Sequence, residues 1–291
     1  MGQMSLDTPG HERSGLVPLA VEDFMFVEKV GLRKTLKDLR LLGPQFAFRQ
    51  LMPKRDNKWV VTVPGYPPIY LRPGTTDVAI VRCIIGQKEY SLAGTGFDQV
   101  CRRRYNELVA AGQRPLIVDA GANIGAASLW FAREFPKALI MAIEPEAANA
   151  ACLRENTAEA QNIVVREAAL GASAGKVALT NPANHDWAFR SERTTDGSGI
   201  EIVTIPQIIA SAEGAVPFLA KIDIEGFESD LFAENIDWIG DFDVLMIEIH
   251  DWMFPGRGSS HSLQKAMAPH GFDLMLRGEN LVYVKVRKDG V

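Results

Sequence analysis

The chain has 291 residues, of which 47% are hydrophobic and 23% charged, and its formal net charge is −5. This composition excludes a disordered chain, and the length suits one large domain or one domain with a small addition. The acidic balance argues against a nucleic-acid partner, because such binders usually gather basic charge on one face. Cys83, Cys101 and Cys152 form no Cys-x-x-Cys pair, so neither a disulfide framework nor a cysteine zinc site is predicted. We therefore expect a reducing, cytoplasmic location.

Residues 1–57 are predicted to form a polar tail and an amphipathic helix outside the main domain. The helix is expected over residues 20–42, where Leu32, Leu36 and Leu39 share one face and basic side chains lie toward the other. A basic amphipathic helix can lie on a membrane surface. We favour the alternative, in which the three leucines pack on the protein's own domain. No uncharged run reaches the ~18 apolar residues of a membrane span, so no span is predicted.

Residues 58–112 are predicted to form a lead-in made of a hairpin and two helices. The stretch 59–72 holds two apolar runs separated by Pro-Gly and Pro-Pro, which is typical of a hairpin. Residues 76–85 and 97–111 follow with the apolar spacing of helices.

Residues 113–291 are predicted to form one α/β domain with a doubly wound sheet of about seven strands. Short apolar runs alternate here with helical stretches, as in a parallel sheet that is covered on both faces. The expected strands lie at 116–118, 138–143, 163–165, 218–224 and 244–249, with an edge strand at 177–179. Two last runs, 272–276 and 281–286, flank a polar turn and predict a terminal antiparallel hairpin.

A glycine turn with the sequence DAGANIG follows the first strand of this sheet, over Asp119–Gly125. Ligands of open parallel sheets bind beyond the carboxyl ends of the strands. Gly121 lets the backbone approach a ligand without an intervening Cβ, and Gly125 permits tight packing of the next helix. Glu144 ends the second strand, where an acid can accept hydrogen bonds from both hydroxyls of a ribose.

The chemistry of this turn favours S-adenosylmethionine over a dinucleotide. Its Gly-x-x-x-Gly spacing differs from the Gly-x-Gly-x-x-Gly fingerprint, and Asp119 would repel a pyrophosphate. S-adenosylmethionine carries an ammonium group and no phosphate, so an acid beside the turn suits it. Two alternatives stay open: a nicotinamide-dependent oxidoreductase and a non-catalytic binding module with the same fold. The acids and the histidine at the later strand ends argue against the second.

Together, these motifs resemble the FkbM-type S-adenosylmethionine-dependent methyltransferases, which have the class I, Rossmann-like methyltransferase fold. The similar segments are Asp119–Gly125, Glu144-Pro145, Lys221–Glu228 (KIDIEGFE) and Glu248–His250 (EIH), after a similar lead-in over residues 71–90. The resemblance covers roughly residues 70–286 and implies O-methylation of a sugar, a glycolipid or a natural product. It also implies roles by motif position. The methionine part of the cofactor would contact Asp119 and Gly121, Asn123 and Gly125 would belong to the same site, and the ribose would contact Glu144.

The third strand departs from the family pattern, because Ala168 stands where an Asp or Asn often holds the adenine amine. We expect the backbone at Ala168, or the polar stretch 181–190, to replace this contact. The stretch also holds His185, Trp187 and Arg190, which we interpret as substrate-binding residues of a lid. An ordinary surface loop is the alternative.

The end of the fourth strand carries three charged residues in alternation. Lys221, Asp223 and Glu225 are expected to share one face of the strand. Buried charges without partners are costly, so we expect these side chains to point into the cleft, with Lys221 binding substrate and Asp223 also near the cofactor. The alternative for Lys221 is a structural ion pair with an acid.

The fifth strand places Glu248 and His250 on one face, beside Asp223 if the two strands are neighbours. A histidine accepts a proton near neutral pH, as methyl transfer to a hydroxyl requires. His250 is therefore the first candidate base and Asp223 the second, with Glu225 as a third catalytic residue. The alternative is Mg²⁺ held by Asp223, Glu248 and His250. The predicted reaction is methylation of a hydroxyl group on a small molecule.

Overall fold

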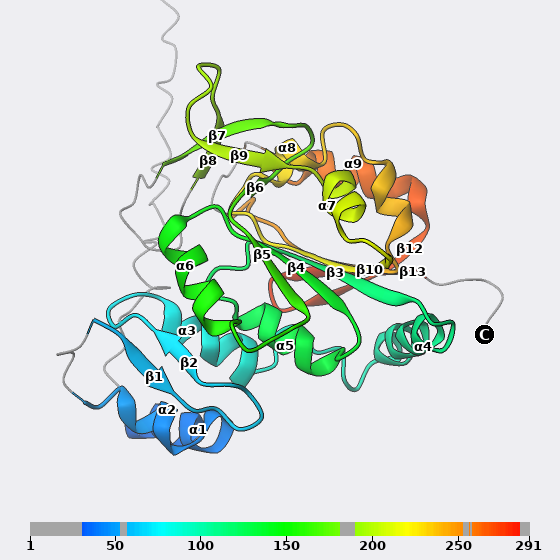
Figure 1. Ribbon diagram of the computed structural model, residues 1–291. Helices are drawn as coiled ribbons and strands as arrows, with labels where there is room; N and C mark the ends of the chain where they lie inside the picture. Colours follow the sequence, from blue (N-terminus) through cyan, green and yellow to red (C-terminus); the bar gives the residue numbers. More distant parts are fainter. Residues whose placement is uncertain (1–30, 53–56, 181–189, 253–255, 257, 286–291) are drawn as a thin grey trace, which may run out of the picture.

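The computed structural model describes residues 31–52, 57–180, 190–252, 256 and 258–285. Within them, seven strands form one sheet in the order β12-β13-β11-β10-β3-β4-β5 (Figure 1). β13 runs opposite to the six other strands of this sheet, and its antiparallel pairing with β12 confirms the terminal hairpin. The strand order reverses between β3 and β10, which is where open sheets bind ligands. The strands are β3 (Arg114–Ala120), β4 (Leu139–Ile143), β5 (Ile163–Arg166), β10 (Ala215–Ile222), β11 (Val244–Glu248), β12 (Phe272–Arg277) and β13 (Asn280–Lys285).

Helices cover both faces of this sheet. On β3, Ile117 packs with Phe131 of one helical layer, whereas Val118 packs with Ile208 and Leu263 of the other. Because both faces are buried, the central strands are nearly continuous apolar runs, and this made them predictable. One layer holds α4 (Gly96–Ala110), α5 (Ala126–Glu134) and α6 (Ala147–Asn156), and the other holds α7 (Ile205–Ser211), α8 (Glu228–Leu231) and α9 (His261–Met267). Short 3-10 turns lie at Asp237–Asp241 and Ala268–His270.

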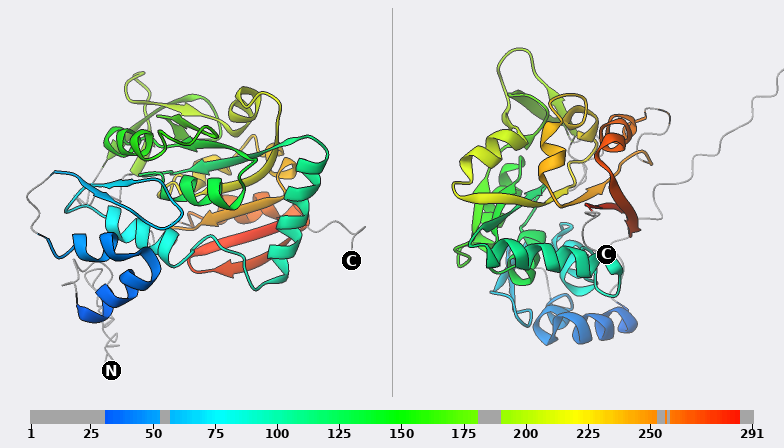
Figure 2. Two further views of the ribbon diagram at one scale, coloured as in Figure 1. Left: turned by 60° about the horizontal axis from the view of Figure 1, so that its bottom comes forward. Right: turned by 90° about the vertical axis from the view of Figure 1, so that its right-hand side faces the viewer.

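The N-terminal elements pack below the layer of α5 and α6, on the same side of the sheet as α4 (Figure 2). Leu42, Phe46 and Trp59 belong to a buried cluster with Ile124 and Leu129 at the start of α5. The predicted hairpin is confirmed, and the predicted helix over residues 76–85 ends in a π-helical turn, η2. The elements are α1 (Leu32–Leu42), α2 (Pro44–Arg49), β1 (Trp59–Val61), β2 (Ile69–Leu71), α3 (Asp77–Val81) and η2 (Arg82–Gly86).

The predicted packing of the leucine face of α1 is wrong. Leu32, Leu36 and Leu39 are 77%, 54% and 36% exposed, and the buried face of the helix centres instead on Asp38. The Asp38 carboxylate accepts hydrogen bonds at 2.8 and 2.9 Å from the Arg82 guanidinium. A buried carboxylate must face its partner, so this ion pair sets the rotation of the helix. The alternative of membrane contact stays a prediction, and residues 20–30 lie outside the described residues.

A second, four-stranded sheet lies beyond the end of β5, in the order β6-β9-β7-β8. The edge strand expected at 177–179 belongs to this sheet and not to the main one. Arg190 begins β8 and pairs with Thr180 through the backbone. His185 and Trp187 lie outside the described residues, as does the side chain of Arg190, so the lid stays a prediction. The strands are β6 (Ala169–Leu170), β7 (Gly175–Thr180), β8 (Arg190–Arg193) and β9 (Ile200–Val203). Among the described helices, none is both long and apolar enough to cross a membrane.

Candidate active site

A cavity of about 310 Å³ lies at the carboxyl ends of β3, β4, β10 and β11. The turn after β3 and the ends of the other strands supply its polar lining. The N-terminal elements supply a second wall, which is mostly apolar. The predicted residues that line the cavity are Gly121, Asn123, Glu144, Ala168, Lys221, Asp223, Glu225 and Glu248; the unpredicted ones include Ile80, Cys83, Ile84, Glu89, Tyr90, Asn149 and Phe227.

The glycine turn is shaped by close contacts within the chain. Gly121 has a φ of 73°, and a Cβ there would lie 1.7 Å from the backbone oxygen of Asp223. Gly125 has a φ of 90°, and its Cβ would lie 2.6 Å from Leu153 of α6. Both glycines are therefore required by the approach of neighbouring elements, with or without a ligand. Gly121 also lines the cavity, whereas Gly125 does not.

Asp119 lies beneath the cavity and is not part of its lining. Its side chain is fully buried, and Oδ2 accepts a hydrogen bond at 2.6 Å from the Ser128 hydroxyl. Its Oδ1 lies 3.4 Å from the Lys221 ammonium. Asp119 thus holds the turn and the start of α5 in place from below, and the predicted contact with the methionine part of the cofactor stays untested.

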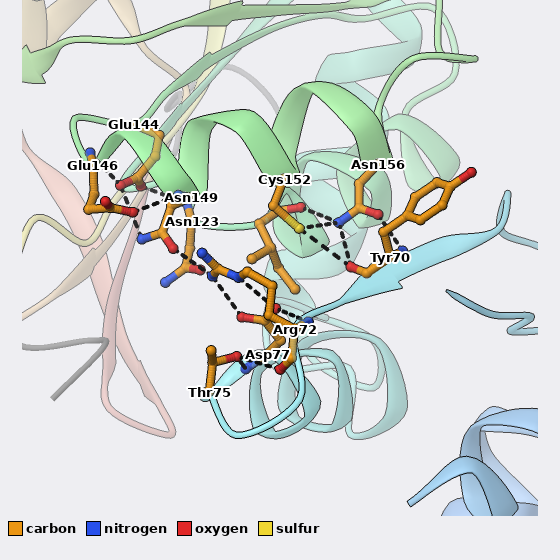
Figure 3. Close-up of polar contacts among 11 residues, drawn as sticks. Tyr70, Arg72, Thr75, Asp77, Asn123, Glu144, Glu146, Asn149, Cys152 and Asn156 are labelled. Atoms are coloured by element: carbon orange, nitrogen blue, oxygen red, sulfur yellow. Dashed lines mark hydrogen bonds and ion pairs between the residues drawn. The ribbon is translucent and has the colours of Figure 1, made fainter. Parts of the chain in front are cut away.

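Glu144 lies at one end of the cavity and is held by the glycine turn (Figure 3). Its Oε2 accepts a hydrogen bond at 2.8 Å from the Asn123 amide, and its Oε1 accepts one at 3.0 Å from the Glu146 amide. Burial raises the pKa of this carboxyl to about 7, although the hydrogen bonds oppose the shift. Asn123 lines the cavity beside Glu144, and its Oδ1 atom is buried and has no hydrogen-bond partner among the described residues.

A polar relay that was not predicted connects Glu144 with the N-terminal elements (Figure 3). The Asn149 side chain donates to Glu144 at 3.4 Å and accepts from Arg72 at 2.7 Å. Arg72 forms a bidentate ion pair with the fully buried Asp77, at 2.8 and 3.0 Å. Asn156 of α6 also bonds the backbone of Tyr70. The sequence feature that could have indicated this relay is the similarity of residues 71–77 to the family's lead-in.

Lys221 is a buried cation between the two central strands. Its ammonium donates to the carbonyl oxygens of Ala120 and Gly121 at 3.1 and 2.8 Å and lies 3.4 Å from both Asp119 and Asp223. Burial lowers the pKa of Lys221, but Asp223, Asp119 and Glu248 more than offset this effect, so the pKa lies above its usual value. These contacts are those of the structural ion pair that was the alternative for Lys221.

The predicted alternation along the fourth strand holds only as far as Asp223. β10 ends at Ile222, and Glu225 has a φ of 54°, in the left-handed region. Glu225 is therefore not on the strand's face. The tight turn nevertheless brings its carboxylate back beside that of Asp223, and both line the cavity.

His250 lies at the centre of a carboxylate cluster. Its Nε2 atom is 3.7 Å from Asp223 Oδ1, 3.6 Å from Glu225 Oε2 and 3.8 Å from Glu248 Oε1. Its Nδ1 atom lies 3.1 Å from Oε1 of Glu228, a buried residue whose role was not predicted although it belongs to the KIDIEGFE motif. His250 is 3% exposed and does not itself line the cavity, whereas the three carboxylates around Nε2 do.

The charged groups of this cluster shift one another's pKa values. Burial lowers the pKa of His250. The hydrogen bond to Glu228 and the charges of Glu228, Asp223 and Glu225 more than offset the effect of burial and raise the pKa to about 10. Burial and the charge of Asp223 raise the pKa of Glu225 to about 8 and that of Glu248 to about 9. Carboxylates outnumber cations here, so the cluster favours the uptake of positive charge.

Comparisons with known proteins found one family model and a set of solved structures that match this chain. The profile of the methyltransferase FkbM domain matches residues 119–275. Solved structures with a similar fold include precorrin-6y C5,15-methyltransferase from Geobacter metallireducens, at 12% identity and a TM-score of 0.34, covering 67% of this chain and 92% of that one. Magnesium protoporphyrin IX methyltransferase from Synechocystis has 13% identity and a TM-score of 0.33, covering 69% of this chain and 89% of that one. A search of curated proteins found no match.

Proposed function

This chain belongs to the FkbM methyltransferase family and is an S-adenosylmethionine-dependent methyltransferase, and we propose that its acceptor is a hydroxyl group of a sugar, a glycolipid or a natural product. The observation that carries the proposal is the division of the cavity. Glu144 and Asn123 border one end, and the carboxylates of Asp223, Glu225 and Glu248 border the other. The first end suits the adenosine part of the cofactor, and the second suits a group that must lose a proton.

The lining of the cavity supports a separate contact for the ribose, the adenine and the sulfonium of the cofactor. Glu144 is already fixed by backbone amides, so its remaining lone pairs can accept hydrogen bonds from the ribose hydroxyls without reorganisation. The adenine would lie against Ala168 and Leu170, which line the cavity after β5. The sulfonium then faces Asp223, whose charge complements it.

The reaction is a displacement at the methyl carbon. The hydroxyl oxygen forms a bond to the methyl carbon, the bond from carbon to sulfur breaks, and the sulfur keeps the electron pair. The hydroxyl proton must leave, and a carboxylate that faces the cavity is positioned to take it. Asp223 suits this role better than His250, because Asp223 lines the cavity whereas His250 lies behind the carboxylates.

The test is an acceptor screen with labelled S-adenosylmethionine. Hydroxylated sugars, glycolipids and natural products form one panel, and matched amines form the other. We expect release of S-adenosylhomocysteine and a methyl ether product only with members of the first panel. Methylation confined to the amines would refute the proposal. An Asp223→Asn variant should keep its affinity for S-adenosylhomocysteine, which lacks the sulfonium charge, and lose turnover by ~10²–10⁴ if the carboxylate takes the proton.

A further inference from the structure

The carboxylate cluster around His250 has the arrangement of a metal site. One ligand atom each from Asp223, Glu225 and His250 lie within 4.8 Å of one another. The Nε2 atom of His250 lies 3.6–3.8 Å from an oxygen of each surrounding acid. These separations are too long for hydrogen bonds. An ion bound at ~2.0–2.3 Å separates its ligand atoms by roughly 3–3.7 Å, so it would fit with only a small closure of the cluster.

The orientation of His250 supports the same interpretation. Its side chain is 2% exposed, and within the described residues Nε2 has no hydrogen-bond partner although it points at the carboxylates. The other ring nitrogen, Nδ1, is bonded to Glu228 at 3.1 Å. Glu228 is in turn oriented by the Ile224 amide, which donates to Oε1 at 3.1 Å. A carboxylate behind the ring, with the opposite nitrogen aimed at other acids, is the usual setting of a metal-ligating histidine.

The charge balance also calls for a cation. Four acids surround the imidazole: Asp223, Glu225, Glu228 and Glu248. Lys221 neutralises only part of this charge, because it contacts the far oxygen of Asp223 and divides its contacts between that residue, Asp119 and two carbonyl groups. A divalent ion between Nε2 and the carboxylates would supply the missing positive charge.

We propose that Asp223, Glu225 and His250, with Glu248 at the edge, bind one divalent cation of the Mg²⁺ and Mn²⁺ class. Carboxylate oxygens dominate the ligand set, which favours this class, and the single imidazole favours Mn²⁺ over Mg²⁺. Because the carboxylates line the cavity, the cation would lie where an acceptor hydroxyl enters and would lower the pKa of that hydroxyl. The role in catalysis rests on the proposed function; the site itself does not.

The experiment measures binding without cofactor or substrate. The full chain is stripped with chelator and titrated with Mn²⁺, following the loss of the free-ion electron paramagnetic resonance signal. We expect one Mn²⁺ per chain, competition by Mg²⁺, and affinity at least ~10-fold weaker in Glu225→Gln and His250→Ala. Glu225 lies in a turn after β10 and its side chain is 29% exposed, whereas that of His250 is 2% exposed, so the Glu225 variant stays informative if His250→Ala fails to fold. Glu213→Gln, an exposed acid remote from the cluster, should bind as the wild type does.

Two results would overturn the metal site: no Mn²⁺ bound by the folded wild type, or binding unaffected by Glu225→Gln. A third result, full turnover in excess EDTA, would overturn the role of the cation in catalysis. The last would leave methyl transfer to hydroxyls intact and remove only this role. Conversely, Mn²⁺ binding by a protein that methylates only amines would uphold the metal site and refute the proposed acceptor. The two proposals therefore fail separately.

Discussion

The pH dependence of cofactor binding tests the assignment of Glu144. Burial raises the pKa of this carboxyl to about 7, so about half of the unliganded molecules carry it protonated at that pH. A ribose contact needs the ionised form, which accepts both hydroxyl hydrogens. Affinity for S-adenosylmethionine should therefore be constant above about pH 8 and weaken as the pH falls through 7. The limiting slope is tenfold per pH unit, or about 1.4 kcal/mol.

The expected loss of cofactor affinity on substitution of Glu144 follows from the same contact. Glu144→Gln removes a charge-assisted acceptor, which is worth ~1.5–3 kcal/mol, so the dissociation constant should rise about 10-fold to 150-fold above pH 8. The variant should also lose the pH dependence of the wild type. This separates Glu144 from the acids near His250, because those groups titrate in both proteins.

Isothermal titration calorimetry with S-adenosylhomocysteine between about pH 5.5 and 8.5 provides the measurement, since the product analogue avoids turnover. Circular dichroism confirms that the variant is folded at each pH. A wild-type affinity that is flat across this range would refute the reasoning, and so would a folded Glu144→Gln variant that binds as tightly as the wild type.

Three other substitutions test features of the structure. Gly121→Ala places a Cβ 1.7 Å from a backbone oxygen and should abolish stable folding. Its control is Gly94→Ala, at a φ of 85° but with open space around it, which should lower the free energy of unfolding by only about 1 kcal/mol. Thermal denaturation compares the two variants. Asp38→Asn leaves Arg82 buried without its counter-charge and should lower the free energy of unfolding by ~3–5 kcal/mol in a urea titration. Asn149→Ala interrupts the relay to Glu144 and should weaken cofactor affinity by roughly 0.5–1.5 kcal/mol in calorimetry, with little change in turnover at saturating cofactor.

Each of these expectations has its own contradicting result. A stable Gly121→Ala protein would mean that the turn can move away from β10. An Asp38→Asn protein as stable as the wild type would remove the ion pair as the cause of the orientation of α1. Unchanged affinity in Asn149→Ala would show that backbone amides alone hold Glu144.

The features that were predictable from sequence are those with a local cause. The strands buried on both faces are apolar runs. The turn Asp119–Gly125 and the acid Glu144 follow the carboxyl ends of strands, the edge at which open parallel sheets generally bind ligands. The orientation of α1 was not predictable, because it depends on an ion pair between Asp38 and Arg82, 44 positions apart. Glu225 was placed on the correct side of the cavity for the wrong reason: the chain turns there instead of continuing as a strand.

The relay from Arg72 through Asn149 to Glu144 has a thermodynamic consequence. A ligand that binds Glu144 also favours the docked position of the N-terminal elements, and by linkage their docking favours the ligand. Cofactor addition should therefore slow amide hydrogen exchange in β2 and α3, at a distance from the adenosine itself. A protein shortened to residues 113–291 would keep the strands of the main sheet but would lose one wall of the cavity and this mutual reinforcement.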